Sequence, residues 1–481
     1  MSGPKRVSVP RRDLSVLLVL LLTSAASSAA VAAAETAAAG AIETVDFPTA
    51  VARALRNNPG LSAAVFDRAV AASDAFAARG YLLPALTFEE KFVRTNVPAE
   101  AFAFKMNQER LSASDFANVD NFNKPPPIND SITSITLSQP LFAPKAWLGY
   151  RMAGRESDAR GLDLLRKKEE TVHRVVAAYL DVLTAKEYLG VAEKSLEDAR
   201  EHLRVAETLE KAGLGLASDV LRAKVFLAQA ESAKVTAEAR HALARNGLAL
   251  AMGERGGTSV DAAAPLPPFP AGGTLEERIA GATSVRADLK AFSLRVANAG
   301  SNVDLQKSDY LPAVGLTGAY QVDAGDGVLS PDNHTWKVGV GLSWNLFDGL
   351  RREAAVAKAK AEGGRAREYF RGARNEAAFE VTQAHLAVEE AERRAEIARA
   401  AAASAEEGLR LIKARYENQL ARMVDLLDAQ SALNAARADR VRAGNDLLRA
   451  RADLEYATGT LLSWSAGEAP PGKAEKAEKG R

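Results

Sequence analysis

The 481-residue sequence contains no cysteine, few aromatic residues (6%) and no excess of either charge, since 62 Lys and Arg face 61 Asp and Glu. Without cysteine there is no disulfide framework, thiolate metal site, cysteine nucleophile or acyl anchor on an N-terminal cysteine. A net charge of +1 with mixed signs argues against a nucleic-acid-binding protein, which needs a clustered basic surface. A mean hydropathy of −0.14 and the lack of a ~20-residue apolar run after the N-terminal segment exclude a polytopic helical membrane protein. Membrane β-strands, which are short and alternating, remain compatible with this composition.

Motifs of catalysis and of metal or phosphate binding are also missing. The five histidines show neither an HExxH motif nor clustered ligand spacing: His173, His202, His241, His334 and His385. Gly213-Leu-Gly215 follows a helical pattern and not a strand, so it is no phosphate loop. The sequence therefore predicts a protein that is not an enzyme and holds no cofactor or metal.

The N-terminal segment has the three parts of a cleaved secretory signal. A basic start up to Arg12 precedes the apolar run Leu14–Leu22, and small residues follow as far as Ala34. We expect residues 1–34 to be removed, so that the mature chain begins near Glu35 outside the cytoplasm. The alternative is an uncleaved anchor, because residues 14–34 carry no charge, although alanine and serine make a weak membrane span.

Three short motifs each occur twice, in the same order, which indicates an internal duplication. The pairs are Leu83-Pro84-Ala85 with Leu311-Pro312-Ala313, residues 137–144 (LSQPLFAP) with 342–349 (LSWNLFDG), and Asp219-Val220-Leu221 with Asp425-Leu426-Leu427. The second and third pairs keep register within one residue, as two copies of a rod of fixed length would. We predict a first repeat over 35–270, a second over 271–464 and a disordered tail over 465–481.

The sequence of each repeat predicts the same series of elements: a helix that leads to the strands (the approach helix), two strands, a long helix and a shorter returning helix. The expected approach helices are 47–80 and 275–310, and each ends at a Leu-Pro-Ala motif. The expected strands are 85–94, 131–142, 314–321 and 336–346. The expected long helices are 146–212 and 350–416, and the returning helices are 219–252 and 425–461. The connector 253–273, rich in glycine, proline and alanine, is expected to be irregular.

The strand at 336–346 alternates most clearly. Its apolar face carries Trp336, Val338, Val340, Leu342, Trp344 and Leu346, and the other face carries polar and small residues. This length and period fit a transmembrane strand of ~9–11 residues with a lipid face and a lumen face. In the first strand Glu90 falls on the apolar face with Leu86 and Phe88, which argues against full lipid exposure there.

The long helices are free of proline. About 65 residues at 1.5 Å per residue give a rod of about 100 Å. A heptad seam runs along the first rod and predicts packing against another helix as a coiled coil. The seam residues are Leu189, Ala192, Leu196, Ala199, Leu203 and Ala206.

Four strands cannot close a membrane barrel, because the smallest single-chain barrels use about eight and open edges leave backbone groups unpaired in lipid. We therefore predict a mainly α protein with a small membrane β part. Its long coiled-coil α-barrel continues a β-barrel to which each chain of a homo-oligomer contributes four strands. The alternative of another class is an exported structural coiled-coil protein without a pore, which would not need the alternation at 336–346.

The duplicated plan resembles the TolC family of outer-membrane efflux and secretion channels over about residues 45–462. Further matching segments are Asp46-Phe47, Asn58-Pro59, Arg286-Ala-Asp-Leu289 and Gly213-Leu-Gly-Leu-Ala-Ser-Asp219. The resemblance implies a homotrimer in the cell outer membrane that extends into the periplasm. It also implies two partners, a periplasmic adaptor (membrane fusion) protein and an inner-membrane pump or ABC exporter. The expected function is the exit duct of a tripartite efflux pump for small molecules; the alternative is the outlet of a type I protein secretion system.

In this family the turns between long and returning helices form a periplasmic tip that is closed at rest. Carried over by position, Asp425 and Asp428 would form acidic rings at the constriction. Such converging carboxylates raise one another's pKa and favour cations. The resemblance also implies that Asp219, Tyr416 and Arg422 make the contacts that hold the tip shut.

Two departures from the family pattern lie in the second turn. Arg422 stands one position after the expected arginine site at Ala421, and Gln419 stands where the family has glycine, so we expect the closing contacts to differ. The acidic residues have an alternative role as helix caps, for which the candidates are Ser218 or Asp219, and Asp425 with Asp428.

The first repeat is longer because of the segment 95–130. It holds Phe102, Phe104, Met106, Phe116 and Phe122, more aromatic residues than a disordered loop usually carries. We expect an ordered extracellular lid over the barrel mouth, and the alternative is a plain surface loop.

Overall fold

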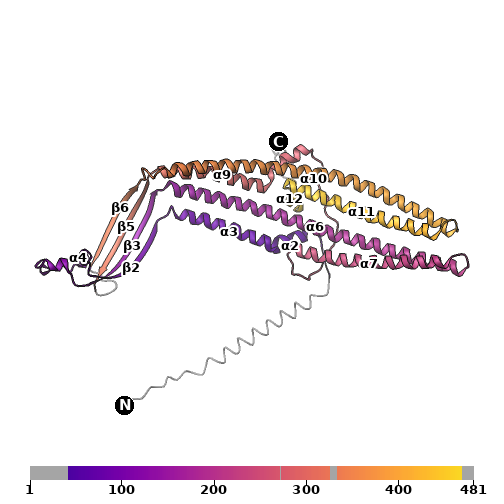
Figure 1. Ribbon diagram of the computed structural model, residues 1–481, viewed down its shortest axis with the longest axis horizontal. Coiled ribbons are helices and arrows are strands. Elements are labelled where there is room, and N and C mark those ends of the chain that lie inside the picture. The colour runs from indigo at the N-terminus through magenta and orange to yellow at the C-terminus, as the bar shows by residue number, and fades with distance from the viewer. Residues whose placement is uncertain (1–41, 271, 326–332, 468–481) are drawn as a thin grey trace, which may run out of the picture.

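The computed structural model describes residues 42–270, 272–325 and 333–467. The expected signal segment 1–34 and the tail from residue 468 onward lie outside the described residues. The molecule is elongated, with a four-stranded sheet at one end and long helices that run away from it (Figure 1). Among the described residues, no helix combines the length and the apolar character needed to cross a membrane.

One antiparallel sheet combines a hairpin from each repeat. Its strand order is β2 (Ala85–Thr95), β3 (Ile128–Phe142), β5 (Ala313–Ala324) and β6 (His334–Ser343). The hairpins join through β3 and β5, with Ser131 opposite Ala324 at one end of the pairing. β2 and β6 form the two edges of the sheet.

The two faces of the sheet differ as the alternation predicts. On one face a cross-strand row runs from Phe88 through Ile135 and Tyr320 to Trp336. The next row along the strands, on the other face, runs from Thr87 through Thr136 and Ala319 to Lys337. The apolar side chains of β6 are about two-thirds exposed or more: Trp336 75%, Val338 65%, Val340 67% and Leu342 65%. An apolar face of this size in one chain indicates contact with lipid.

The last strand ends at Ser343, three residues earlier than the sequence pattern predicts. The indole N–H of Trp344 donates to the carbonyl of Tyr310 at 3.0 Å. The Arg352 guanidinium donates to the carbonyl of Asn345 at 2.8 Å. These contacts turn the chain toward the following long helix, so the expected strand residues 344–346 lie beyond the sheet.

Glu90 lies on the apolar face, as its position in the alternation predicts. The hydroxyls of Ser131 and Thr133 on the neighbouring strand donate to its two carboxylate oxygens at 2.6 and 2.5 Å. The sheet itself therefore satisfies this carboxylate, which reduces the cost of its position.

Each expected approach helix is two helices, so the prediction of one continuous helix is wrong in both repeats. In the first repeat α2 (Phe47–Asn57) and α3 (Pro59–Gly80) are separated by Asn58. A residue before proline favours extended backbone, and the Asn58 side chain accepts hydrogen bonds from the N–H groups of Gly60 and Leu61. In the second repeat α8 (Leu275–Val285) and α9 (Ala287–Lys307) are separated by Arg286.

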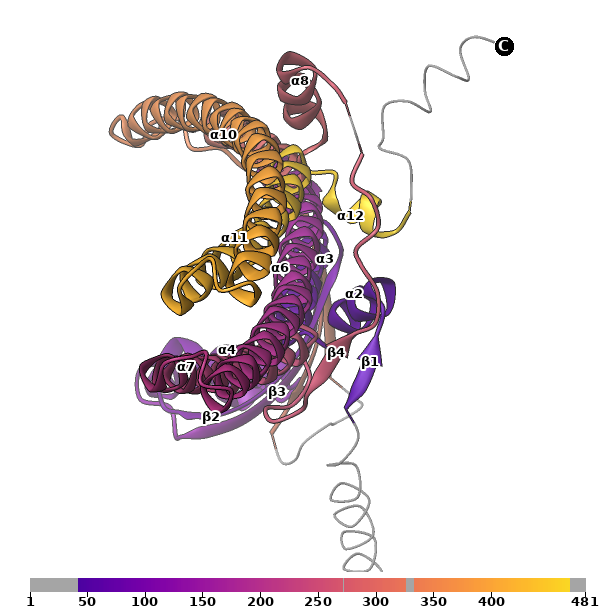
Figure 2. The same cartoon turned by 90° about the vertical axis from the view of Figure 1, so that its right-hand side faces the viewer.

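The long helices have close to their expected bounds. α6 (Pro144–Lys211) returns through α7 (Ala217–Ala251), and α10 (Arg351–Glu417) returns through α11 (Met423–Thr458). The 68 and 67 residues of α6 and α10 correspond to rods of about 100 Å. The predicted seam packs against the returning helix, with Leu196 and Ala199 buried against Ala230. Seen along the rods, α10, α11, α6 and α7 form a curved layer (Figure 2).

Smaller elements lie on the convex side of this curved layer (Figure 2). They are α2, α8, α12 (Leu461–Ser465) and a parallel pair of short strands, β1 (Glu43–Val45) and β4 (Val260–Ala262). β4 lies in the connector 253–273, which is therefore not wholly irregular, and α12 extends order to the first residue of the expected tail. Here the main core joins both ends of the described chain, since Phe47 and Phe269 contact Trp464 with ring centroids 5.3 and 4.2 Å away.

The segment 95–130 contains α4 (Pro98–Asn107), a 3₁₀ turn (Ala113–Phe116) and α5 (Asp120–Asn123). Phe102 packs against Phe116 and Phe122, with ring centroids 6.2 and 5.2 Å apart. α4 lies beyond the end of the sheet that is farther from the long helices (Figure 1).

A charge on the apolar face should impair membrane assembly, and the same charge on the other face should not. For Val340→Arg, opposite Leu316, we expect a cost of about 2–4 kcal/mol if the site lies near the bilayer midplane. Thr317→Arg, on the polar face, is the matched control. Heat-modifiable migration of membrane-fraction protein measures folded material, and equal yields from both variants would contradict the orientation of the sheet.

Candidate functional site

The two coiled-coil hairpins turn at the end of the molecule farthest from the sheet (Figure 1). The turn between α6 and α7 contains Gly213 with φ +74°, and the turn between α10 and α11 contains Gln419 with φ +61°. Gln419 therefore adopts the left-handed conformation that favours glycine, at a cost of about 1–2 kcal/mol.

An apolar cluster joins the two turns within one chain. Its buried members are Ala206, Val220, Ala223, Tyr416, Met423 and Leu426. Burial raises the pKa of Tyr416, and the Asp219 carboxylate raises it further. The structure thus brings together Tyr416 and Asp219, two of the expected tip-closing residues, inside a single chain.

Arg422 and Asp425 pair at the start of α11. The backbone N–H of Arg422 donates to Asp425 Oδ2 at 3.0 Å, and its guanidinium Nη2 donates to Oδ1 at 3.1 Å. The side-chain hydrogen bond, followed by the backbone one, lowers the pKa of Asp425. The Arg422 side chain is otherwise 80% exposed. Asp425 therefore helps to cap its own helix, but from the third helical position and not from the helix start that the alternative interpretation predicts, and Asp428 is exposed one turn later.

The predicted cap of the first returning helix is wrong. α7 begins at Ala217 with Leu216 at the capping position, and no side chain caps it. Asp219 lies within the first turn, where its carboxylate is 4.0 Å from the Arg222 guanidinium. A negative charge in the first turn still interacts favourably with the helix dipole.

The sequence interpretation missed a buried polar network between the two hairpins. His202 Nε2 lies 3.0 Å from Gln430 Oε1, and Gln430 Nε2 donates to Asp198 at 3.1 Å. Nearby, Asn434 donates to Ser195 Oγ at 2.8 Å. His202 and Gln430 are 4% and 0% exposed, so the contact between α6 and α11 is partly polar. The detectable signal was His202, a polar residue beside the apolar seam of the first rod.

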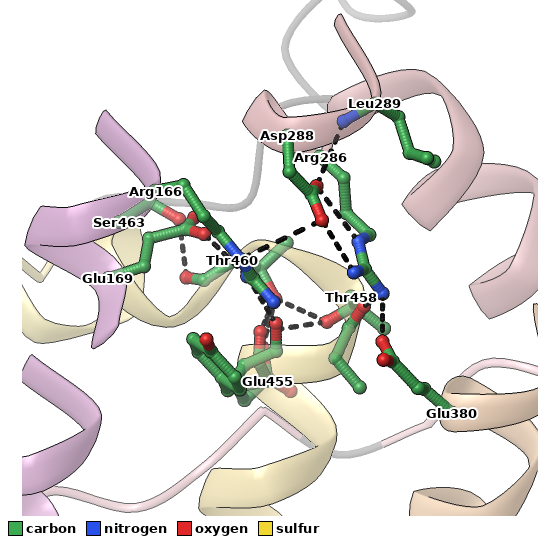
Figure 3. Close-up of polar contacts among 12 residues, drawn as sticks. Arg166, Glu169, Arg286, Asp288, Leu289, Glu380, Glu455, Thr458, Thr460 and Ser463 are labelled. Carbon is green, nitrogen blue, oxygen red and sulfur yellow. Dashed lines mark hydrogen bonds and ion pairs between the residues drawn. The ribbon is translucent and has the colours of Figure 1, made fainter. Parts of the chain in front are cut away.

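A second polar cluster lies where α8 meets α9 (Figure 3). The Arg286 side chain is 6% exposed, donates to Asp288 at 2.7 Å and pairs with Glu380 of α10. Burial alone would lower the pKa of Arg286, but its two carboxylate partners outweigh burial and raise it. Arg166 of α6 stacks on Tyr456 of α11 with 3.9 Å from Cζ to the ring centroid. The cluster therefore joins four long or approach helices at one level.

Comparison with known proteins supports a membrane-channel fold. The chain is 28% identical over 312 residues to the outer membrane efflux protein BepC of Brucella suis, an alignment that covers 63% of this chain and 66% of the relative. It is 29% identical over 355 residues to the protein CyaE of Bordetella pertussis, covering 69% and 72%. A crystal structure of a membrane protein from Pseudomonas aeruginosa has a TM-score of 0.73 at 22% identity, covering 88% of this chain and 97% of that one.

The fold and these relatives define an outer-membrane channel. The family profile described as outer membrane efflux protein matches residues 50–254 and 279–460, and the chain belongs to this family. It is a channel and not an enzyme, and it lies in the outer membrane and extends into the periplasm. The expected fold class and family are confirmed, and the alternative of a coiled-coil protein without a pore is wrong.

Loss of Arg286 should destabilise the joint between the helices. Arg286→Met keeps much of the side-chain volume but leaves Glu380 unpaired and leaves Asp288 only the more distant Arg166, 4.0 Å away, so we expect about 1–3 kcal/mol less stability in urea unfolding. Glu380→Gln, which removes one exposed charge, should cost less.

The ion pair between Arg286 and Asp288 also predicts how the stability lost in Arg286→Met depends on pH. Burial raises the pKa of Asp288, but Arg286 and Arg166 lower it more, so its net pKa is below the ordinary value. The ion pair of Asp288 therefore stabilises the folded protein fully above about pH 4, the ordinary pKa of an aspartate in an unfolded chain. This stabilisation is lost as the pH falls below that value and the carboxylate becomes protonated. The difference between wild type and Arg286→Met should therefore shrink below pH 4, and a difference that grows there would contradict this assignment.

Proposed function

We propose that this chain forms, as a homotrimer, the exit duct of a tripartite efflux pump that exports small molecules. The observation that supports it is a four-stranded sheet with an apolar face and two open edges, attached to a curved wall of rods about 100 Å long. Open edges leave N–H and C=O groups unpaired in lipid, so strands of other copies must complete the sheet.

The space that a lumen needs supports three copies over two. Two copies would supply eight strands, and a barrel of eight is filled by its own side chains. Three copies supply twelve strands, which leave room for a passage lined by the polar face. The family resemblance also implies a trimer.

The partners of the duct are proposed to be a periplasmic adaptor protein and an inner-membrane pump. Rods of about 100 Å reach far from the outer membrane, so the tip is the part that meets these partners. The alternative is an ABC exporter and the secretion of a protein, because the walls of the duct do not depend on the cargo.

Two experiments test this proposal. Native mass spectrometry of the detergent-solubilised protein should give three copies, and a monomer would contradict it. Expression in a strain without its own outlet, with either a pump and adaptor or a type I exporter, should restore drug resistance in the first case. Restored secretion of the protein substrate alone would favour the alternative.

At the tip we propose that Asp425 and Asp428 surround the axis of the trimer. Because Arg422 already neutralises part of the charge of Asp425, the exposed Asp428 contributes most of the uncompensated charge. Asp219 and Tyr416, together with Arg422, are proposed to hold the tip closed. Segment 95–130 is likewise proposed as a lid, which its packed phenylalanines support.

Removal of the tip carboxylates should change conduction. In planar bilayers, Asp425→Ala with Asp428→Ala should raise single-channel conductance or weaken cation preference. Asp428→Asn alone should weaken that preference more than Asp425→Asn. Since the pKa of Asp425 is lowered, its charge should persist as the pH is reduced from 7 to 5. If the double variant conducts like the wild type with the same ion preference, the acidic constriction is wrong.

A further inference from the structure

Two carboxylates lie side by side at the end of the sheet that meets segment 95–130. Asp130 of β3 and Asp323 of β5 are both 0% exposed. Asp323 pairs with Ile132, two residues from Asp130, so the two aspartates are diagonal neighbours on the polar face of the sheet. Neither carboxylate belongs to the tip or to the polar cluster around Arg286 described above.

Amide groups surround the aspartate pair. The side chain of Gln108, which follows α4 and is 3% exposed, donates through Nε2 to Asp130 Oδ1 at 2.9 Å and to the Asn129 carbonyl at 2.8 Å. Gln321 Nε2 donates to both Asp323 oxygens at 3.0 Å. The site is thus closed by the strands on one side and by the end of α4 on the other.

The charge of the pair is not balanced by these neighbours. Within the described residues neither aspartate has an ion pair, and Asp130 Oδ2 is buried without a hydrogen-bond partner. Arg110 donates to Gln108 Oε1 at 3.2 Å and not to a carboxylate, and Lys91, which lies opposite Ile132 on the same face, makes no ion pair with either aspartate within the described residues. Two buried carboxylates without a counter-charge cost several kcal/mol each. One shared proton would neutralise one charge, whereas a divalent cation neutralises both.

We propose that Asp130 and Asp323 bind a hard divalent cation, Ca²⁺ or Mg²⁺, that fastens segment 95–130 to the sheet. The available ligands are oxygen atoms, which such cations prefer. Among the described residues no group of three or more acidic, histidine or cysteine side chains forms a metal site, so water and neutral oxygens complete the coordination. With only two charged ligands the affinity belongs to the weak, ~10⁻⁴–10⁻³ M class. The inference is independent of the exported cargo.

Calcium binding to the full-length protein in detergent tests the site directly. After treatment with a chelator, calorimetric titration with Ca²⁺ should show one saturable site per chain. Asp130→Asn with Asp323→Asn should abolish it, and each single variant should weaken it at least tenfold. The matched control is Asp115→Asn in the same segment, because Asp115 already pairs with Lys105 at 2.6 Å and should leave binding unchanged.

Limited trypsin digestion gives a second readout, which reports on the segment that the cation is proposed to fasten. Cleavage after Lys105 or Arg110 should be about fivefold or more slower with 5 mM Ca²⁺ in wild type and in Asp115→Asn. The double variant should show no such protection, and heat-modifiable migration verifies that it has folded. Absence of saturable Ca²⁺ and Mg²⁺ binding up to 10 mM, or equal binding by the folded double variant, would overturn the proposal. Protection that follows pH but not the cation would overturn it in favour of a shared proton.

Discussion

The constraint on which the rest of this structure depends is the hydrogen bonding of the sheet edges. β2 and β6 each present one row of backbone groups without a partner strand in the described chain, beside an apolar face that fits lipid. In water such edges are a risk of aggregation, but in lipid they are not tolerated at all. Assembly with other copies is therefore a requirement of the secondary structure.

The helical part continues the same geometry. Four long helices form one curved layer, and the smaller elements α2, α8 and α12 cover only its convex side (Figure 2). An asymmetric layer of this kind has an inside and an outside, as the wall of a tube does. The cluster around Arg286 lies at the level of these smaller elements and connects the two hairpins of one chain (Figure 3).

Periodic features of the sequence predicted most of the fold. The alternation in β6 gave the faces of the sheet, and the proline-free heptad pattern gave the rods and their partners, because both periods reflect burial directly. Breaks were harder to predict. The Asn58-Pro59 signal was visible but was not interpreted as a helix end, and the break at Arg286 coincides with an ion pair to Glu380, which is distant in sequence.

The tip was predicted only in outline. Helix starts at Ala217 and Met423 precede the acidic residues by two positions each, so local capping rules placed both helix starts too late, although Asp425 still accepts the backbone N–H of Arg422. The link between His202 and Gln430 joins residues on different hairpins, and no local period reveals which polar groups meet across such a distance. Contacts between copies of the chain at the tip could not be predicted from the sequence, because they form only in the assembled oligomer.

The core around Trp464 has a consequence for the order of folding. Its partners Phe47 and Phe269 come from the beginning and the middle of the described chain, while Leu461 and Trp464 come from its end. Contacts of such high sequence separation form slowly, because a very long loop must close first. The polypeptide therefore cannot complete this centre until nearly all of it has been exported. During that interval its strands and apolar surfaces remain without their partners.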